Sequence, residues 1–492
     1  MGGRVGEWDG KAATEESLTR HLPFGGIKSH PRIASLLYFQ LSRIAFQRNV
    51  RVKEQLLERF RNRDAAVGII GLGYVGLPLA DAFCRQGFTV VGFDVAADKV
   101  DDLNAGRSYL KTIPDDKIRA MVDTGRFRAT ADFDELAAVD AVLMCVPTPL
   151  TRHREPDMTY VAATTETIAA RLKPGHLVVL ESTTYPGTTA ELVKTRLEAG
   201  GLTCGKDFFL AYSPEREDPG NIDFETSTIP KVVGGDDEAS FELARTLYEQ
   251  IVGEVVTVSS LATAEAVKLT ENIFRAVNIA LVNELKVVFD RMGIDVWEVI
   301  AAASTKPFGY MPFYPGPGLG GHCIPIDPFY LTWKAREYEV ATRFIELAGE
   351  INTAMPHYVV ERLSTALDAR FAKPLNGAKV LILGLAYKKN VDDTRESPAF
   401  KIISLLEQRG AKVDYYDPFV PEIKPTREYS DLAGRRCIDF TPTTLKGYDA
   451  ALICTDHDGV AYDTLVENAA LVVDTRNATR ALRNGHGNVV MA

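Results

Sequence analysis

The pattern that most constrains the fold of this chain is a glycine-rich turn between two apolar segments. Residues 67–70 are apolar, Gly-Leu-Gly-Tyr-Val-Gly follows at residues 71–76, and residues 77–86 have helical spacing. A second apolar segment, residues 88–93, ends at Asp94. This order of strand, turn, helix, strand and acid is the pattern of a dinucleotide-binding βαβ unit. We therefore predict that this part of the chain binds a dinucleotide.

Each glycine of the turn has a separate role in such a unit. Gly71 makes the tight turn, Gly73 lets a pyrophosphate approach the backbone, and Gly76 lets the helix pack on the strand. The helix N-terminus then favours the anion. Asp94 would bind the adenosine ribose hydroxyls and repel a 2′-phosphate, so the expected cofactor is NAD rather than NADP. The expected cofactor contacts here are Gly71, Gly73, Tyr74, Val75, Gly76, Asp94 and Lys99.

Three further apolar segments are each followed by polar residues. They occupy residues 141–146, 177–180 and 208–211. Thr148 follows the first segment, Thr183 the second, and Glu215 and Arg216 the third. Ligands of open α/β sheets bind at the carboxyl ends of parallel strands, where these side chains are predicted to lie. For Glu215 and Arg216, a surface ion pair explains the pattern equally well.

A helical pattern runs without interruption over residues 261–292, and it is apolar on most sides, as expected of a buried helix. Lys268, Asn272 and Arg275 share one stripe of this helix. Because buried charges need partners, the stripe is either a substrate-reading face or a salt-bridged domain interface. A second helical pattern follows over residues 342–368, and such paired helices predict a homodimer or a larger homo-oligomer.

A loop rich in glycine and proline, residues 313–331, separates the two helices and contains Cys323 and Asp327. That composition is typical of a loop shaped around a ligand. A free cysteine is often only a small buried apolar residue. A thiolate becomes useful when an aldehyde must be oxidised further, because the thiohemiacetal can lose a second hydride and leave a thioester for water to cleave. Lys268, Asp327 and Glu215 are the candidate acids and bases for such chemistry.

A second α/β unit begins at residue 379, with strands expected over residues 379–384 and 412–416. Its turn lacks the three glycines and carries cations instead, which predicts a different phosphorylated ligand. The expected fold class is α/β, with two Rossmann-like parallel-sheet domains joined by a long central helix and a helical dimerisation region. The expected domains are an N-terminal extension (1–53), with an amphipathic helical pattern over 33–50, an NAD-binding domain (54–258), a central helical domain (259–370) and a C-terminal domain (371–492) for the second phosphorylated ligand.

Composition limits the class of protein further. The chain has 492 residues and a net charge of −10, which argues against a nucleic-acid surface. Its six cysteines are spread out without a CxxC pair, so neither a disulfide framework nor a metal site is indicated. No apolar run approaches the 18 residues of a membrane helix, and the expected location is the cytoplasm.

Eight motifs occur in one order along the chain: GLGYVGLPLA, CVPTP, ESTTYPGTT, SPER, the Lys268–Arg275 stripe, GPGLGGHCIPIDP, GLAYKKNVDDTRESP and DTRN. In these motifs the chain resembles the UDP-glucose/GDP-mannose dehydrogenase family from residue 54 to the C-terminus. The resemblance implies a four-electron oxidation of the C6 alcohol of a nucleotide sugar to a carboxylate, with two NAD+. It also implies that the C-terminal domain (371–492) binds the UDP-sugar.

The resemblance also implies roles for individual residues. Cys323 would be the nucleophile, while Lys268 and Asp327 assist proton transfer and oxyanion stabilisation. Glu215 and Thr183 would serve thioester hydrolysis, Thr183 by holding water. The catalytic set it implies is Cys323, Lys268, Asp327, Glu215, Thr183 and Asn272. The substrate contacts it implies are Glu215, Arg216, Lys268, Asn272, Arg275, Phe313, Tyr314, Gly316, Gly320, Lys388 and Arg476. The further cofactor contacts are Thr148, Thr183 and Arg395.

One departure from the family bears on the substrate. UDP-glucose members usually have Gln-Lys between the cysteine and the aspartate, whereas this chain has Ile-Pro-Ile. His322, Arg275 and the Tyr185-Pro186 turn look like the branch that acts on UDP-N-acetylhexosamines in bacterial surface-polysaccharide synthesis. The expected order is UDP-N-acetylglucosamine, then UDP-N-acetylmannosamine or UDP-N-acetylgalactosamine, then UDP-glucose. His322 would either lower the thiol pKa or hold the loop. A non-catalytic sensor and a two-electron dehydrogenase stay open as alternatives.

Overall fold

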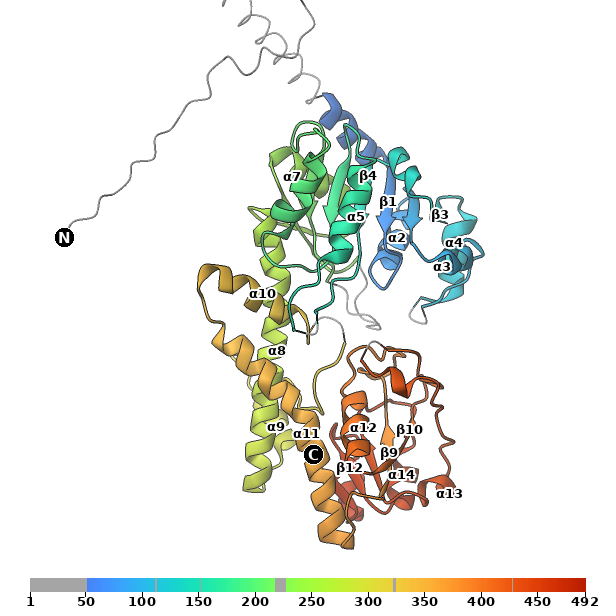
Figure 1. Ribbon diagram of the computed structural model, residues 1–492, viewed down its shortest axis with the longest axis vertical. Helices are drawn as coiled ribbons and strands as arrows, with labels where there is room; N and C mark the ends of the chain where they lie inside the picture. Colours follow the sequence, from blue (N-terminus) through green and yellow to red (C-terminus); the bar gives the residue numbers. More distant parts are fainter. Residues whose placement is uncertain (1–50, 111–112, 152, 217–226, 322–323, 427) are drawn as a thin grey trace, which may run out of the picture. The chain divides into compact units, whose positions relative to one another are not determined.

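The computed structural model describes residues 51–110, 113–151, 153–216, 227–321, 324–426 and 428–492. The chain divides into two units between Val52 and Lys53, and the architecture below is that of the second unit. The helix predicted over residues 33–50 lies outside the described residues, and so do His322 and Cys323. The described chain is mixed α/β, with two sheets and long helices between them in sequence (Figure 1).

The first sheet has eight strands in the order β3-β2-β1-β4-β5-β6-β7-β8. They are β1 (Ala66–Ile70), β2 (Thr89–Phe93), β3 (Phe127–Thr130), β4 (Ala141–Met144), β5 (Leu177–Leu180), β6 (Phe209–Tyr212), β7 (Lys231–Gly235) and β8 (Val255–Thr257). The order reverses at β1, between β2 and β4, and such a switch point is where open α/β sheets bind ligands. The strands predicted from sequence are confirmed within two residues, whereas β3, β7 and β8 were not predicted.

The sheet was predicted to be parallel, and one pair of strands departs from this prediction: β7 pairs antiparallel with β6. Strand β8 then pairs parallel with β7 across helix α7 (Glu238–Tyr248). The other helices of this region are α2 (Gly76–Arg85), α3 (Ala97–Asn104), α4 (Asp115–Asp123), α5 (Thr159–Ala169) and α6 (Thr195–Glu198). Strands β4, β5 and β6 are buried along their whole length, as expected of central strands covered on both faces.

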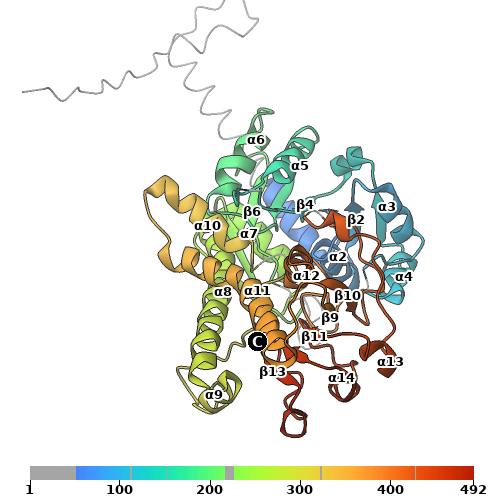
Figure 2. The same ribbon diagram turned by 60° about the horizontal axis from the view of Figure 1, so that its bottom comes forward.

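Two long helices follow the first sheet. Helix α8 spans Leu261–Met292, the bounds predicted from sequence, and α11 spans Arg343–Phe371. Ser260 caps α8 by accepting a hydrogen bond from the Thr263 N–H (3.1 Å), and Gly293 ends it with a φ of 71°. The two helices pack side by side in both views (Figures 1 and 2). Between them in sequence lie α9 (Val296–Ala303) and α10 (Asp327–Ala335).

The prediction that α8 is buried on most sides is wrong for one face. Phe274, Leu281, Val288 and Met292 are 44–63% exposed. Their spacing of seven, seven and four residues places them on one stripe of the helix. The opposite face, which includes Asn272 and the small residues next to α11, is buried. The apolar composition of α8 therefore serves two separate faces.

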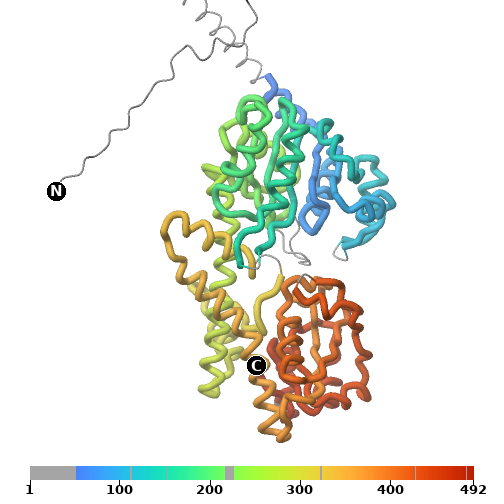
Figure 3. The backbone as a smooth tube through the Cα atoms, viewed as in Figure 1, coloured from blue at the N-terminus to red at the C-terminus, as the bar shows by residue number. Residues whose placement is uncertain are grey.

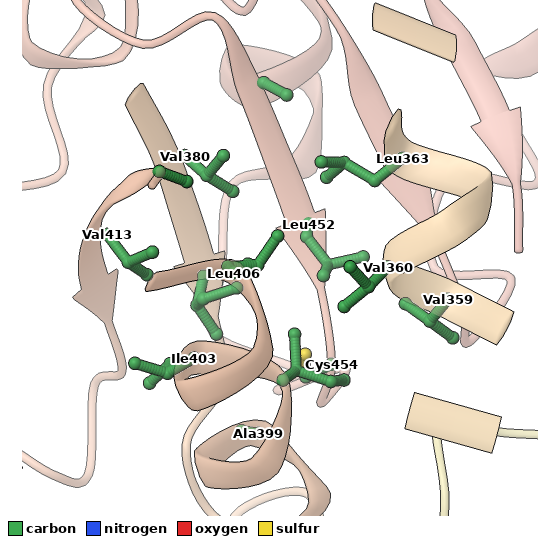
Figure 4. Packing of buried hydrophobic residues seen from close by; sticks show 14 of the residues in the cluster. Val359, Val360, Leu363, Val380, Ala399, Ile403, Leu406, Val413, Leu452 and Cys454 are labelled. Carbon is green, nitrogen blue, oxygen red and sulfur yellow. The ribbon is translucent and has the colours of Figure 1, made fainter. Parts of the chain in front are cut away.

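The chain continues from α11 into a second sheet, a path that the tube in Figure 3 follows. The strands are β9 (Lys379–Leu383), β10 (Lys412–Tyr416), β11 (Ala450–Ile453), β12 (Val472–Asp474) and β13 (Val489–Met491), in the parallel order β10-β9-β11-β12-β13. Helix α12 (Pro398–Gln408) and the end of α11 cover one face. Leu363 of α11, Leu406 of α12 and Leu452 of β11 meet in this core (Figure 4). Two shorter α-helices flank β11 in sequence, α13 (Pro442–Leu445) before it and α14 (Tyr462–Asn468) after it.

None of the described helices combines the length and the apolar character that a membrane span requires.

Candidate active site

The glycine-rich turn after β1 has the geometry that its sequence predicts. Gly71 has a φ of +92°, and a Cβ there would lie 2.5 Å from the Cys145 carbonyl oxygen. A Cβ on Gly76 would overlap the Gly71 carbonyl oxygen. A Cβ on Gly73 would meet no atom within 4 Å. The outer two glycines are thus required by packing, and the middle one leaves open the side from which a pyrophosphate would approach.

Asp94 follows β2 and lies beside this turn. Its carboxylate accepts hydrogen bonds from the Leu72 N–H (3.2 Å) and the Ala96 N–H (3.0 Å). Lys99 Nζ lies 3.7 Å from the same carboxylate. These contacts fix the carboxylate while leaving acceptor capacity, because an ionised carboxylate has about four lone-pair sites. The arrangement fits a ribose diol at Asp94, and therefore fits NAD at this turn.

Arg395 is the one predicted cofactor contact that comes from the second α/β unit. Its guanidinium lies 4.5 Å from the centroid of the Tyr74 ring, in the glycine-rich turn. Asp393 holds the guanidinium with an ion pair of 2.6 Å. The structure therefore brings Arg395 to the cofactor turn, more than 300 residues away in sequence.

A second cluster joins α8 to the start of α10. Asp327 is 1% exposed and accepts a hydrogen bond from Asn272 Nδ2, while Asn272 Oδ1 accepts one from Arg275. Burial raises the pKa of Asp327 to about 7, although Lys268, Asn272 and Arg275 oppose the shift. A carboxyl group with a pKa near neutrality can take up or release a proton at working pH. The stripe predicted on α8 therefore has a buried acid as its partner.

Glu215 and Arg216, after β6, have different environments. The Glu215 carboxylate accepts hydrogen bonds from Lys231 Nζ (3.0 Å) and from the Arg216 N–H (2.7 Å). Arg216 forms an ion pair with Glu271 of α8 (2.6 Å) and donates to the Pro230 carbonyl (2.7 Å). Arg216 and Glu215 thus each take part in an ion pair, with Glu271 and with Lys231, and the substrate contacts predicted for both residues stay predictions.

The loop before Cys323 is held by contacts from three directions. The Gly316 N–H donates to Asn283 Oδ1 (3.0 Å), and a Cβ on Gly316 would lie 2.6 Å from Arg476 Nη1. A Cβ on Gly320 would lie 2.5 Å from Cβ of Tyr387. Glycine is needed at both positions because the loop packs directly on the second α/β unit.

The remaining predicted contacts are aromatic, basic or threonine side chains. Phe313 packs edge-to-face on Phe274 of α8, with centroids 5.7 Å apart, and Tyr314 stacks on Trp297 of α9 at the same separation. Arg476 is anchored by a hydrogen bond from its Nε to the Cys454 carbonyl (2.9 Å). Lys388 lies in the turn after β9, Thr148 follows β4, and Thr183 follows β5.

Sequence reasoning missed two buried groups that support the site. Asn283 and Asn352 form a chain of amides: Asn352 Nδ2 donates to the Ala276 carbonyl (3.0 Å), and Asn283 Nδ2 donates to Asn352 Oδ1 (2.9 Å). Asn283 lies on the Lys268 stripe, eleven residues after Asn272, so the helical period could have found it. Lys231 opens an unpredicted strand, and no local pattern marks it as a partner of Glu215.

The first sheet, its switch-point turn and the residues around Asp94 define an α/β protein of the dinucleotide-binding class. Family models for the UDP-glucose/GDP-mannose dehydrogenase family match the chain in three parts: the NAD binding domain at residues 65–252, the central domain at residues 262–354 and the UDP binding domain at residues 381–481. The chain belongs to this family, and it contains the NAD binding domain of the family.

Its curated relatives differ in the sugar that their names state. A UDP-N-acetyl-D-glucosamine 6-dehydrogenase from Pseudomonas aeruginosa is 38% identical over 75% of this chain and 86% of the relative. An NDP-N-acetyl-D-galactosaminuronic acid dehydrogenase from Ralstonia solanacearum is 36% identical over 85% of this chain and 97% of the relative. Among solved structures, a UDP-D-ManNAc dehydrogenase from Pyrococcus horikoshii has a TM-score of 0.77 at 33% identity, covering 87% of this chain and 98% of that one.

Proposed function

We propose that this protein oxidises the C6 alcohol of a UDP-N-acetylhexosamine, first of all UDP-N-acetylglucosamine, to the uronic acid in two NAD-dependent steps. The observation that carries the proposal is the buried cluster of Lys268, Asn272 and Asp327. Of these residues, Asp327 follows Cys323 by four positions in sequence. A buried acid with a pKa near 7 next to a lysine suits proton transfer at an alcohol and at a carbonyl. The family to which the chain belongs supports the reaction class.

Each residue of the site has a separate role in the proposed oxidation. Asp327 takes the proton of the C6 hydroxyl, and Lys268 and Asn272 stabilise the oxygen that becomes an oxyanion. The glycine-rich turn and Asp94 would hold NAD+, which would supply the hydride acceptor for each oxidation at C6. Cys323 adds to the aldehyde, so that a second hydride can leave and a thioester forms. Glu215 and Thr183 serve the hydrolysis of that thioester.

The nucleotide end of the substrate is assigned to the second α/β unit. Arg476 and Lys388 supply cations for the diphosphate, and Gly316 allows Arg476 to reach the loop. The cluster of Arg395, Tyr74 and Asp94 serves the cofactor instead. Support for UDP as the nucleotide comes from the family's UDP binding domain, which matches residues 381–481.

The identity of the sugar is the most specific part of the proposal, and a comparison of four substrates tests it. Purified protein is given UDP-N-acetylglucosamine, UDP-N-acetylmannosamine, UDP-N-acetylgalactosamine and UDP-glucose, each with NAD+, and kcat/KM and product mass are measured. The proposal expects UDP-N-acetylglucosamine to have the highest kcat/KM. A higher value for UDP-glucose would overturn the assignment to the N-acetylhexosamine branch. Binding of NAD+ and UDP-sugar without turnover would favour the sensor.

We also propose that two copies of the chain pair through α8 in the cytoplasm. The exposed stripe of Phe274, Leu281, Val288 and Met292 supports this proposal, because large contiguous apolar faces usually mark an interaction site. A long helix presents the same stripe to a symmetric partner, as an isologous interface requires.

A further inference from the structure

A buried charged network lies behind Glu215, and the proposed mechanism does not use it. Lys231, the first residue of β7, is 3% exposed. Its Nζ donates to Glu181 Oε2 (2.7 Å) and to Glu215 Oε2 (3.0 Å). Glu181 follows β5, and its other carboxylate oxygen accepts a hydrogen bond from the Tyr248 hydroxyl at the end of α7. The same ammonium lies 5.4 Å from the centroid of the Tyr248 ring.

The members of this network differ in their access to the site. The side chains of Glu181 and Lys231 are 0% and 3% exposed, whereas that of Glu215 is 11% exposed. Tyr248 is also fully buried, and the Tyr248 hydroxyl is joined to Lys231 through its hydrogen bond to Glu181. Lys231 in turn contacts Glu215, which the sequence places at the carboxyl edge of the sheet. Tyr248 thus holds Glu181, Glu181 holds Lys231, and Lys231 holds Glu215.

The network also fixes the orientation of Glu215. Lys231 binds one carboxylate oxygen, and the Arg216 N–H binds the other (2.7 Å). Two anchored oxygens hold the plane of a carboxylate, and a fixed ammonium beside it favours the ionised form. A base must be ionised and aimed before it can accept a proton, so both effects serve the same task.

We propose that Lys231, held by Glu181 and Tyr248, is a positioning residue that orients Glu215 as the base for acyl-enzyme hydrolysis. The inference rests on the proposed function, which assigns that step to Glu215. In the step, a water oxygen bonds to the thioester carbonyl carbon, its proton passes to the Glu215 carboxylate, and the carbon–sulfur bond breaks. The sulfur leaves as a thiolate and the product as a carboxylic acid, without any change in oxidation state.

The competing explanation is that the network only joins β5, β7 and α7. In that case the loss of Lys231 would lower stability and slow all steps alike. The proposed role predicts instead that both hydride transfers persist while hydrolysis slows. The acyl-enzyme would then accumulate, which a purely structural role does not predict.

The test is rapid-mixing kinetics of Lys231→Met with NAD+ and the preferred UDP-sugar. We expect a burst of two NADH per active site, then turnover at least tenfold slower than in the wild type, and an acyl adduct in the intact-protein mass. Lys231→Arg, which keeps the charge and the donors, should restore most of the turnover. Lys194→Met is the matched control, because Lys194 forms a 2.7 Å ion pair with Asp236 in the same sheet region without contacting Glu215. It should show no adduct.

Two further variants distinguish a failure of the inference about Lys231 from a failure of the proposed function. Glu215→Gln should also accumulate the adduct, and Lys231→Met combined with Glu215→Gln should turn over no more slowly than Glu215→Gln alone. An adduct in Glu215→Gln but not in folded Lys231→Met overturns the inference and leaves the proposed function standing. No adduct in either variant overturns both. If Lys231→Met does not fold, Lys231→Met with Glu181→Gln removes one buried charge of each sign and should give the same adduct.

Discussion

Asp327 and Lys231 are both buried, yet their surroundings act on them in different ways. Burial dominates at Asp327 and raises its pKa to about 7. At Lys231 burial acts to lower the pKa, but Glu181 and Glu215 outweigh it and the pKa lies above its ordinary value. Asp327 can therefore exchange a proton near neutral pH, whereas Lys231 remains a fixed charge.

The first prediction concerns the pH dependence that Asp327 creates. A base with a pKa of about 7 is protonated and inactive below that pH, so kcat/KM should rise with pH through about 7. Asp327→Asn should lower kcat/KM by roughly 10²- to 10⁴-fold and remove this limb of the profile. Asp236→Asn, at the Lys194 ion pair, should keep the wild-type profile. A wild-type midpoint near pH 4 would show that the Asp327 carboxyl is not shifted.

At the residue scale, the sequence predicts which polar side chains share a helix face better than it predicts which residues they bind. Helical spacing put Lys268, Asn272 and Arg275 on one stripe, and the structure adds that Asp327 is their partner. The role of Lys231 could not be predicted, because its contacts with Glu181 and Glu215 come from separate strands. Local patterns carry no information about pairs of that kind.

At the scale of elements, α8 and α11 hold the loop before Cys323 through a buried amide chain. Helix α11 contains Pro356, which leaves the Asn352 carbonyl without its usual helical donor. The Asn352 side chain bonds to α8 and to Asn283, which binds the Gly316 N–H. The helices were predictable because their periodicity is local. The amide chain was not, because it joins residues 69 positions apart.

The second prediction tests the close approach of Gly316 and Arg476. Gly316→Ala should push the guanidinium aside, since a Cβ would lie 2.6 Å from Arg476 Nη1. A lost charged hydrogen bond costs about 1.5–3 kcal/mol, so KM for the UDP-sugar should rise roughly tenfold to a hundredfold. The melting temperature should change little, because the displaced group is the end of a flexible side chain. Gly200→Ala, where a Cβ meets nothing within 4 Å, is the control. An unchanged KM would contradict the assignment of Arg476 to the substrate.

At the scale of the whole molecule, two sheets of similar topology use their acids differently. Asp94 in the first sheet keeps acceptor capacity beside the glycine-rich turn. Asp94 accepts one main-chain N–H hydrogen bond on each oxygen. Asp417, after β10 in the second sheet, accepts two on each oxygen and also lies 3.1 Å from His457 Nε2. The acid after the second strand is thus free to accept further hydrogen bonds in the first unit, as ribose binding requires, whereas in the second unit the corresponding acid has a structural role. The fold class was predictable from sequence, but this difference depends on which N–H groups surround each carboxylate.

The third prediction concerns the pairing of two copies through α8. Leu281→Glu with Val288→Glu should lower the mass measured by sedimentation from two chains to one. Like charges that face each other in an interface cost several kcal/mol, which corresponds to a hundredfold or greater rise in the dissociation constant. Tyr160→Glu, on the exposed face of α5, should leave the mass unchanged. A wild-type monomer, or a double variant of unchanged mass, would refute pairing through this stripe.

The most direct test of the proposed reaction is the number of NADH molecules formed per UDP-N-acetylhexosamine consumed, measured for the wild type and for Cys323→Ala. We predict two NADH and one uronic acid per sugar in the wild type, and no carboxylate in the variant. One NADH per sugar in both proteins would contradict the account, because the thiol would then be dispensable and the product an aldehyde or ketone.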